Sequence, residues 1–128
     1  MNERMHKILI IDDDPDVVTV LQILLKKNGY GVATATREEE VNHQMDSFGP
    51  DLIILDVLLS GVDGREICRR IKNDNSWKHI PVIMFSAHPG AQKNMKDFGA
   101  DDFLPKPFDS NKLLERVEMQ LAKPRPTL

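Results

Sequence analysis

The chain has 128 residues, of which 41% are hydrophobic and 29% are charged, and these proportions exclude wholesale disorder and fit one globular domain. Seventeen basic and twenty acidic residues leave a formal net charge of −3, so no overall basic field exists to hold nucleic-acid phosphates. The single cysteine, Cys68, excludes an internal disulfide framework, and no apolar run approaches the length of a membrane span. We therefore expect a soluble cytoplasmic domain that binds neither nucleic acid nor membrane.

Short apolar runs alternate along the chain with longer amphipathic stretches. The runs fall at residues 8–11, 32–35, 52–55, 80–85 and 103–104. The first, third and fourth are continuously apolar and rich in branched residues, which is typical of strands that are buried on both faces of a sheet. Each run therefore predicts one strand.

The first two amphipathic stretches carry helix signals at their ends. Asp14 followed by Pro15 predicts the N-cap and first turn of one helix, and Gly29 predicts its end. Thr36 and Glu39 have the spacing of a capping box and predict the start of a second helix.

Three more helices are expected after the third, fourth and fifth strands. Asp63 begins one of them and Asp109 begins the last. The helix between them is the weakest, because only residues 89–98 are available for it, which is less than three turns. Strict alternation of strands and helices predicts an α/β fold whose parallel sheet is covered on both faces.

The domain boundaries follow from this pattern. We expect an N-terminal extension at residues 1–6, one domain over residues 7–122, and a proline-containing tail at residues 123–128. Pro124 and Pro126 lack the backbone donors that would extend the last helix into the tail.

The residues that directly follow the predicted strands carry the chemistry. In an open parallel sheet, ligands bind outside the carboxyl ends of the strands. The residues at these ends are Asp12 and Asp13 after the first strand, Asp56 after the third, Ser86 after the fourth and Lys106 after the fifth. We expect acids from two strands, a hydroxyl and an ammonium group to meet on one rim.

Such an acidic cluster favours a bound cation. Two carboxylates 4 Å apart repel each other by about 4 kcal/mol at an effective dielectric constant near 20. Oxygen ligands favour Mg²⁺, Mn²⁺ or Ca²⁺, and a site open to water and phosphate favours Mg²⁺. Taken singly, Asp14 is explained as a helix cap, and Ser86 or Lys106 as an ordinary loop residue. Asp56 has no such explanation, because neither Val57 nor Leu58 starts a helix.

Four motifs in this order resemble the receiver domain of two-component response regulators, in its stand-alone form without an output domain. They lie at residues 8–16, at 51–56 with Asp63-Gly64 downstream, at 83–87 and at 99–108. The resemblance covers residues 7 to about 122. It implies a flavodoxin-like fold, with a doubly wound five-stranded parallel sheet in the order 2-1-3-4-5 and helices on both faces.

The resemblance also assigns roles at the rim. Asp56 would accept a phosphoryl group from a histidine kinase or a histidine phosphotransfer protein. Asp12, Asp13, Asp56 and the backbone carbonyl of Leu58 would hold Mg²⁺. The Lys106 ammonium would neutralise charge on the transferred group. Beyond self-phosphorylation from phosphodonors and self-dephosphorylation, no enzymatic activity is implied.

A switch is implied as well. Ser86 would hydrogen-bond a phosphoryl oxygen, and Phe103 would turn inward when that hydroxyl moves. The altered face, formed by the fourth helix, fifth strand and fifth helix, would bind a downstream protein or mediate a phosphorylation-dependent dimer of an otherwise monomeric chain. The Lys106–Pro107 bond would be cis. Plain core packing is the alternative explanation for Phe103.

The sequence departs from the family pattern at three points. Ser60 replaces a usual proline, Ser86 replaces the commoner threonine, and the span from Ser86 to Lys106 is shortened within the weak fourth helix.

Two other functions stay open. One alternative is a degenerate receiver that binds proteins without phosphorylation. The other is a phosphatase with an aspartate nucleophile, although Leu58 stands where that class has a second acid.

Overall fold

A computed structural model describes residues 5–59, 61–88, 90, 93 and 95–124 of the chain. Five parallel strands form one sheet in the order β2-β1-β3-β6-β7. Their bounds are Lys7–Ile11 (β1), Gly31–Ala35 (β2), Leu52–Asp56 (β3), Val82–Ser86 (β6) and Asp102–Pro105 (β7). Counted along the five-stranded sheet alone, this is the order 2-1-3-4-5, so the predicted flavodoxin-like fold is confirmed.

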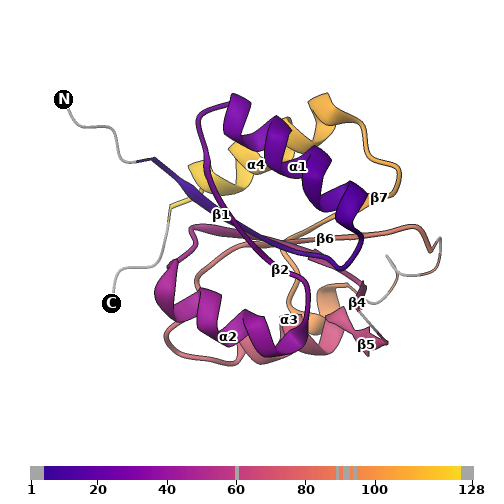
Figure 1. The fold of residues 1–128 in the computed structure, drawn as a ribbon. Helices are drawn as coiled ribbons and strands as arrows, with labels where there is room; N and C mark the ends of the chain where they lie inside the picture. Colours follow the sequence, from indigo (N-terminus) through magenta and orange to yellow (C-terminus); the bar gives the residue numbers. More distant parts are fainter. Residues whose placement is uncertain (1–4, 60, 89, 91–92, 94, 125–128) are drawn as a thin grey trace.

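Helices cover both faces of the sheet (Figure 1). Helices α1 (Pro15–Lys27) and α4 (Ser110–Ala122) lie on one face, and α2 (Glu38–Ser47) and α3 (Gly64–Lys72) lie on the other. Alternate residues of β1 enter the two cores: Ile8 and Ile10 pack with α1 and α4, whereas Leu9 and Ile11 pack with α2 and α3. Burial on both faces explains why residues 8–11 of β1, 52–55 of β3 and 82–85 of β6 are continuously apolar. Within the described residues, no helix is long and apolar enough to cross a membrane.

The predicted caps of the first and last helices are confirmed. The Asp14 carboxylate accepts hydrogen bonds from the backbone N–H groups of Asp16 and Val17, and Pro15 is the first residue of α1. Asp109 caps α4 in the same way. Gly29 follows the end of α1 with φ of +90°, a conformation that favours glycine.

The capping box at α2 is shifted by one residue from the prediction. Glu40, rather than Glu39, accepts hydrogen bonds from the backbone N–H groups of Thr36 and Arg37 and from the Thr36 hydroxyl. The shift arises because Arg37 is the N-cap, so Glu40 occupies the third helical position.

Two further predictions about elements need correction. Strand β6 begins at Val82 instead of residue 80, since the Ile80 N–H bonds to the Trp77 carbonyl and Pro81 has no N–H to donate. Of the helix expected over 89–98, the described part contains a 3₁₀ helix, η2 (Lys96–Phe98), while residues 89, 91, 92 and 94 lie outside the described residues.

A short antiparallel hairpin, absent from the sequence prediction, leaves the end of β3. Its strands are β4 (Leu58–Leu59) and β5 (Val62–Asp63), and Ser60, which falls between them in the sequence, lies outside the described residues. The hairpin returns the chain to the first residue of α3. It therefore connects the rim of the sheet to a helix on one of its faces (Figure 1).

Candidate functional site

The register of the parallel strands brings the predicted acids together. Ile11 pairs with Leu55, so Asp12 and Asp56 are the next residues on two adjacent strands. Asp56 in turn pairs with Phe85, the residue before Ser86. Asp12, Asp56 and Ser86 are 0%, 6% and 4% exposed, so their polar groups lie in a largely desolvated rim.

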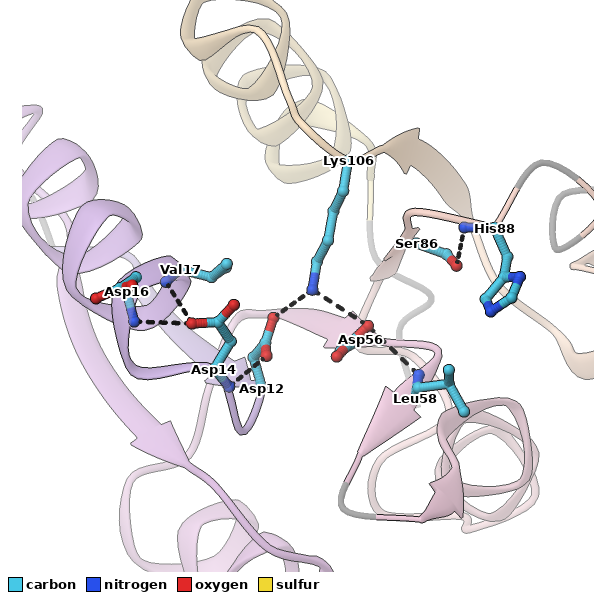
Figure 2. Close-up of polar contacts among 9 residues, drawn as sticks. All are labelled: Asp12, Asp14, Asp16, Val17, Asp56, Leu58, Ser86, His88 and Lys106. Atoms are coloured by element: carbon cyan, nitrogen blue, oxygen red, sulfur yellow. Dashed lines mark hydrogen bonds and ion pairs between the residues drawn. The ribbon is translucent and has the colours of Figure 1, made fainter.

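Lys106 completes this group from the end of the fifth sheet strand. Its ammonium lies 3.0 Å from Asp12 Oδ2 and 3.4 Å from Asp56 Oδ1 (Figure 2). It also lies 4.6 Å from the centre of the Phe85 ring. The Lys106–Pro107 peptide bond is cis, as the resemblance implies. The Lys106 ammonium thus contacts both buried carboxylates.

The environment of Asp56 disfavours its charged form. Burial, and then the neighbouring Asp12 carboxylate, raise the pKa of Asp56 from its ordinary 3.8 to about 6, although Lys106 opposes the shift. The Leu58 N–H also donates to Asp56 Oδ1, at 3.3 Å, and favours the ionised form. Lys106 and the Leu58 N–H therefore only partly oppose the upward shift of the Asp56 pKa that burial, and then Asp12, cause.

The donor set fits a hard divalent cation. Carboxylate oxygens of Asp12, Asp13 and Asp56 all lie within 4.8 Å of one another. Asp12 and Asp56 are buried, whereas Asp13 is exposed, so the cluster is open to water on one side. Oxygen-only donors with partial water access are the ligands that Mg²⁺ prefers. A divalent cation here would favour the ionised form of Asp56, which burial and the Asp12 carboxylate disfavour.

Ser86 and Phe103 occupy the neighbouring strands β6 and β7. The Ser86 hydroxyl accepts a hydrogen bond from the His88 N–H at 3.0 Å (Figure 2). Phe103 pairs with Met84 in register and packs, partly buried, against the core under α2 and α3. Ser86 and Phe103 thus lie on adjacent strands, with Ser86 two residues nearer the carboxyl end of β6 than Met84, the register partner of Phe103.

A hollow next to Val57 and Leu58, the two residues after Asp56, is lined in part by Arg65, which the sequence prediction did not name. The hollow is about 390 Å³ in volume, and its walls include Leu58, His88 and Arg65. Leu58 is 52% exposed there. The Arg65 guanidinium is held by the Asp63 carboxylate, with N–O distances of 2.9 to 3.2 Å. The acid-x-arginine spacing at the start of α3 was the only sequence signal for this pair.

Comparisons with known proteins agree with this geometry. The family model described as "Response regulator receiver domain" matches residues 8–118. The chain is 40% identical over 121 residues to the DNA-binding dual master transcriptional regulator RpaA of Synechocystis, a match that covers 93% of this chain and 50% of that protein. The chain spans about half the length of the curated relatives it matches.

Solved structures give the same result. A putative response regulator from Chloroflexus aurantiacus superposes with a TM-score of 0.87 at 36% identity, covering 94% of this chain and 100% of that one. The BeF3-activated receiver domain of RstA from Klebsiella pneumoniae superposes with a TM-score of 0.84 at 27% identity, covering 92% and 100% of the two chains.

Proposed function

Because this chain belongs to the response regulator receiver domain family, we propose that it is a phosphorylation-controlled switch whose phosphoacceptor is Asp56. The observation that carries the proposal is the convergence of Asp12, Asp13, Asp56 and Lys106 at the carboxyl ends of the strands. In this proposal residues 7–122 form the receiver, flanked by residues 1–6 and 123–128, and the switch operates in the cytoplasm.

The chemistry is transfer of a phosphoryl group from a phosphohistidine to the Asp56 carboxylate. A carboxylate oxygen of Asp56 forms a bond to phosphorus while the bond from phosphorus to the imidazole nitrogen breaks, and the imidazole leaves with its electron pair. Lys106 already contacts Asp56, so its ammonium can neutralise charge on the arriving phosphoryl oxygens.

Asp12, Asp13 and Asp56, with the backbone carbonyl of Leu58, would hold Mg²⁺. The ion would supply charge neutralisation between the carboxylates and the phosphoryl oxygens. A nucleophilic carboxylate must be ionised, and a cation beside Asp56 would favour the ionised form that burial and Asp12 disfavour.

The donor would be a histidine kinase or a histidine phosphotransfer protein. An apolar hollow of about 500 Å³ lies beside Lys106, with walls that include Val17 and Val20 of α1 and Phe108. A protein that brings a phosphohistidine to Asp56 would approach next to this hollow, because Lys106 belongs both to its wall and to the Asp56 site. Val20 and Ile23 extend the apolar surface along α1, since they are 51% and 63% exposed.

Output would follow from movement of Ser86 and Phe103. The Ser86 hydroxyl accepts one hydrogen bond, from His88, and keeps its own proton available to donate to a phosphoryl oxygen. Displacement of Ser86 would open space on β6, into which Phe103 on β7 could turn. The face formed by η2, β7 and α4 would then differ between the two states and would be read by a downstream protein, or by a second copy of the chain.

This proposal is for a signalling module, with self-phosphorylation and self-dephosphorylation as its chemistry. A phosphatase that uses an aspartate nucleophile is disfavoured, because Leu58 offers an exposed apolar side chain where a second acid would act. A receiver that binds partners without phosphorylation is disfavoured by the complete set of acids, hydroxyl and ammonium at the rim.

Intact mass spectrometry after incubation with acetyl phosphate tests the proposal. The wild-type protein should gain one base-labile phosphoryl group when Mg²⁺ is present and none in excess EDTA. Asp56→Asn should gain none, whereas Asp46→Asn, which changes an exposed acid of α2, should behave as the wild type does. Phosphate on Asp56→Asn, or on the wild type without Mg²⁺, would refute the assignment.

A further inference from the structure

The chain leaves the sheet after Asp56 and, at Gly64, returns to contact the backbone of Asp56 and Val57. Between these points it forms the β4–β5 hairpin, in which Leu58 pairs with Asp63 and Leu59 with Val62. Leu58, whose carbonyl is the proposed Mg²⁺ ligand, stands on the outgoing strand of the hairpin. Its position therefore depends on how the base of the hairpin is closed.

Gly64 closes that base through its backbone. It is buried at the first position of α3, and its N–H donates to the Val57 carbonyl. A β-carbon at Gly64 would overlap the Asp56 carbonyl oxygen and lie 3.0 Å from the Asp56 carbonyl carbon. It would also lie 3.1 Å from the Val57 carbonyl oxygen. Because all of these are backbone atoms, no side-chain rotation can relieve the overlap.

The backbone that Gly64 touches is the backbone of the phosphoacceptor itself. The Val57 N–H is held on its other side by the Phe85 carbonyl of β6. A side chain at position 64 must therefore displace either the start of α3 or the backbone from Asp56 to Leu58, whose N–H reaches Asp56 Oδ1. The absence of a side chain at position 64 is thus a geometric condition for the site.

We propose that Gly64 is a positioning residue for phosphoryl transfer: the contact of its bare backbone with Asp56 and Val57 sets the Asp56 carboxylate and the Leu58 carbonyl at the spacing that Mg²⁺ requires. This inference rests on the proposed function for its biological meaning. Its direct consequence, however, is for Mg²⁺ binding and is measurable without phosphate.

The test compares Gly64→Ala with Gly49→Ala. Gly49 has φ of +65° and open space around it, so alanine there strains the backbone without touching the site. Titration with Mg²⁺ alone, followed by the amide NMR signals of Asp56 and Leu58, gives the dissociation constant. We expect it to rise at least tenfold in Gly64→Ala and less than twofold in Gly49→Ala, although both variants lose thermal stability. Equal affinities in the wild type and Gly64→Ala, or equal losses in the two variants, would overturn the proposal.

If Gly64→Ala does not fold, hydrogen exchange of the wild-type protein tests the proposal instead. In metal-free protein the Gly64 N–H should be protected from hydrogen exchange to within about tenfold of the Leu55 N–H in β3. Exchange as fast as in an open loop would overturn the proposal. A wild-type protein that binds Mg²⁺ in this way but never gains phosphate would refute the proposed function and leave the role of Gly64 in the cation site supported.

Discussion

The ammonium of Lys106 lies 3.0 Å from a carboxylate oxygen of Asp12, although the two residues are 94 positions apart in the chain. Asp12 is fully buried, and the Lys106 side chain is only 18% exposed, so this ion pair is protected from solvent. The same ammonium reaches Asp56 at 3.4 Å. The pair therefore joins the first and last strands of the chain to the proposed phosphoacceptor between them.

Lys106→Ala should weaken the fold and slow phosphoryl transfer while leaving a cation site. Loss of a charged hydrogen-bond partner from buried Asp12 should lower the free energy of unfolding by about 2 kcal/mol in EDTA. Mg²⁺ should restore more stability to this variant than to the wild type, because it replaces the missing positive charge. Urea unfolding with and without Mg²⁺ measures both effects, with Lys112→Ala on the exposed side of α4 as the control. Unchanged stability in EDTA would contradict the role given to the ion pair.

The raised pKa of Asp56 predicts that the metal-free protein is more stable in mild acid than at neutral pH, as far as this group is concerned. Between pH 3.8 and about 6, the folded state holds the Asp56 proton more tightly than the unfolded state does. Its stabilising contribution is therefore complete below pH 3.8 and is lost as the pH rises through 6. The loss amounts to at most about 3 kcal/mol.

Asp56→Asn removes the ionisable carboxyl group and therefore the loss of stability that its ionisation causes at neutral pH. In EDTA at pH 7.5 the variant should be more stable than the wild type, and the difference should vanish near pH 4. Urea denaturation at the two pH values gives the comparison. A wild type that is as stable as Asp56→Asn at pH 7.5 would show that the carboxylate is better compensated than the contacts of Asp12 and Lys106 indicate.

Mg²⁺ binding should leave the fluorescence of Trp77 almost unchanged. Trp77 precedes β6, at the amino ends of the strands, whereas the acidic cluster lies at the carboxyl ends. Five residues of strand separate the two ends by about 17 Å. Titration of the metal-free protein measures the effect. Strong saturable quenching that disappears in Asp13→Ala would contradict this separation.

Leu58 and His88 should influence how long the phosphate persists. Hydrolysis needs a water molecule aligned with phosphorus opposite the Asp56 oxygen, and both side chains line the hollow next to Val57, the residue after Asp56. Leu58 cannot orient water by hydrogen bonding, so Leu58→Asn should shorten the acyl-phosphate lifetime several-fold. His88→Ala should change it less. Decay of phosphate followed by intact mass gives the rates, and unchanged decay in both variants would place the attacking water elsewhere.

Ser86 should couple the phosphoryl group to Phe103. Beryllofluoride with Mg²⁺, as a stand-in for the phosphoryl group, should shift amide NMR signals in residues 86–108 and leave those near Trp77 almost still. Ser86→Ala should still accept phosphate at Asp56 but show much smaller shifts at Phe103, because the hydroxyl that moves is missing. A wild-type response in Ser86→Ala would rule out this coupling.

Local sequence signals were sufficient for most elements. The branched apolar runs at 8–11 and 52–55 predicted strands that the fold buries on both faces. Asp14 and Asp109 predicted helix starts that the structure confirms, because a capping bond joins residues only two or three positions apart. The same locality explains the error at Glu39: a shift of one residue in the N-cap transferred the role to Glu40.

The sequence by itself determined which polar residues end each strand, since the alternation of apolar runs and helices is a property of neighbouring residues. Only the tertiary structure decided their mutual geometry. The pairing of Ile11 with Leu55 sets Asp12 beside Asp56, and the crossover to β7 brings Lys106 to both. Only the return of the chain against the backbone of Asp56 and Val57 shows why Gly64 has no room for a side chain. Burial, and hence the raised pKa of Asp56, depends on the packing of distant segments, which no short stretch of sequence encodes.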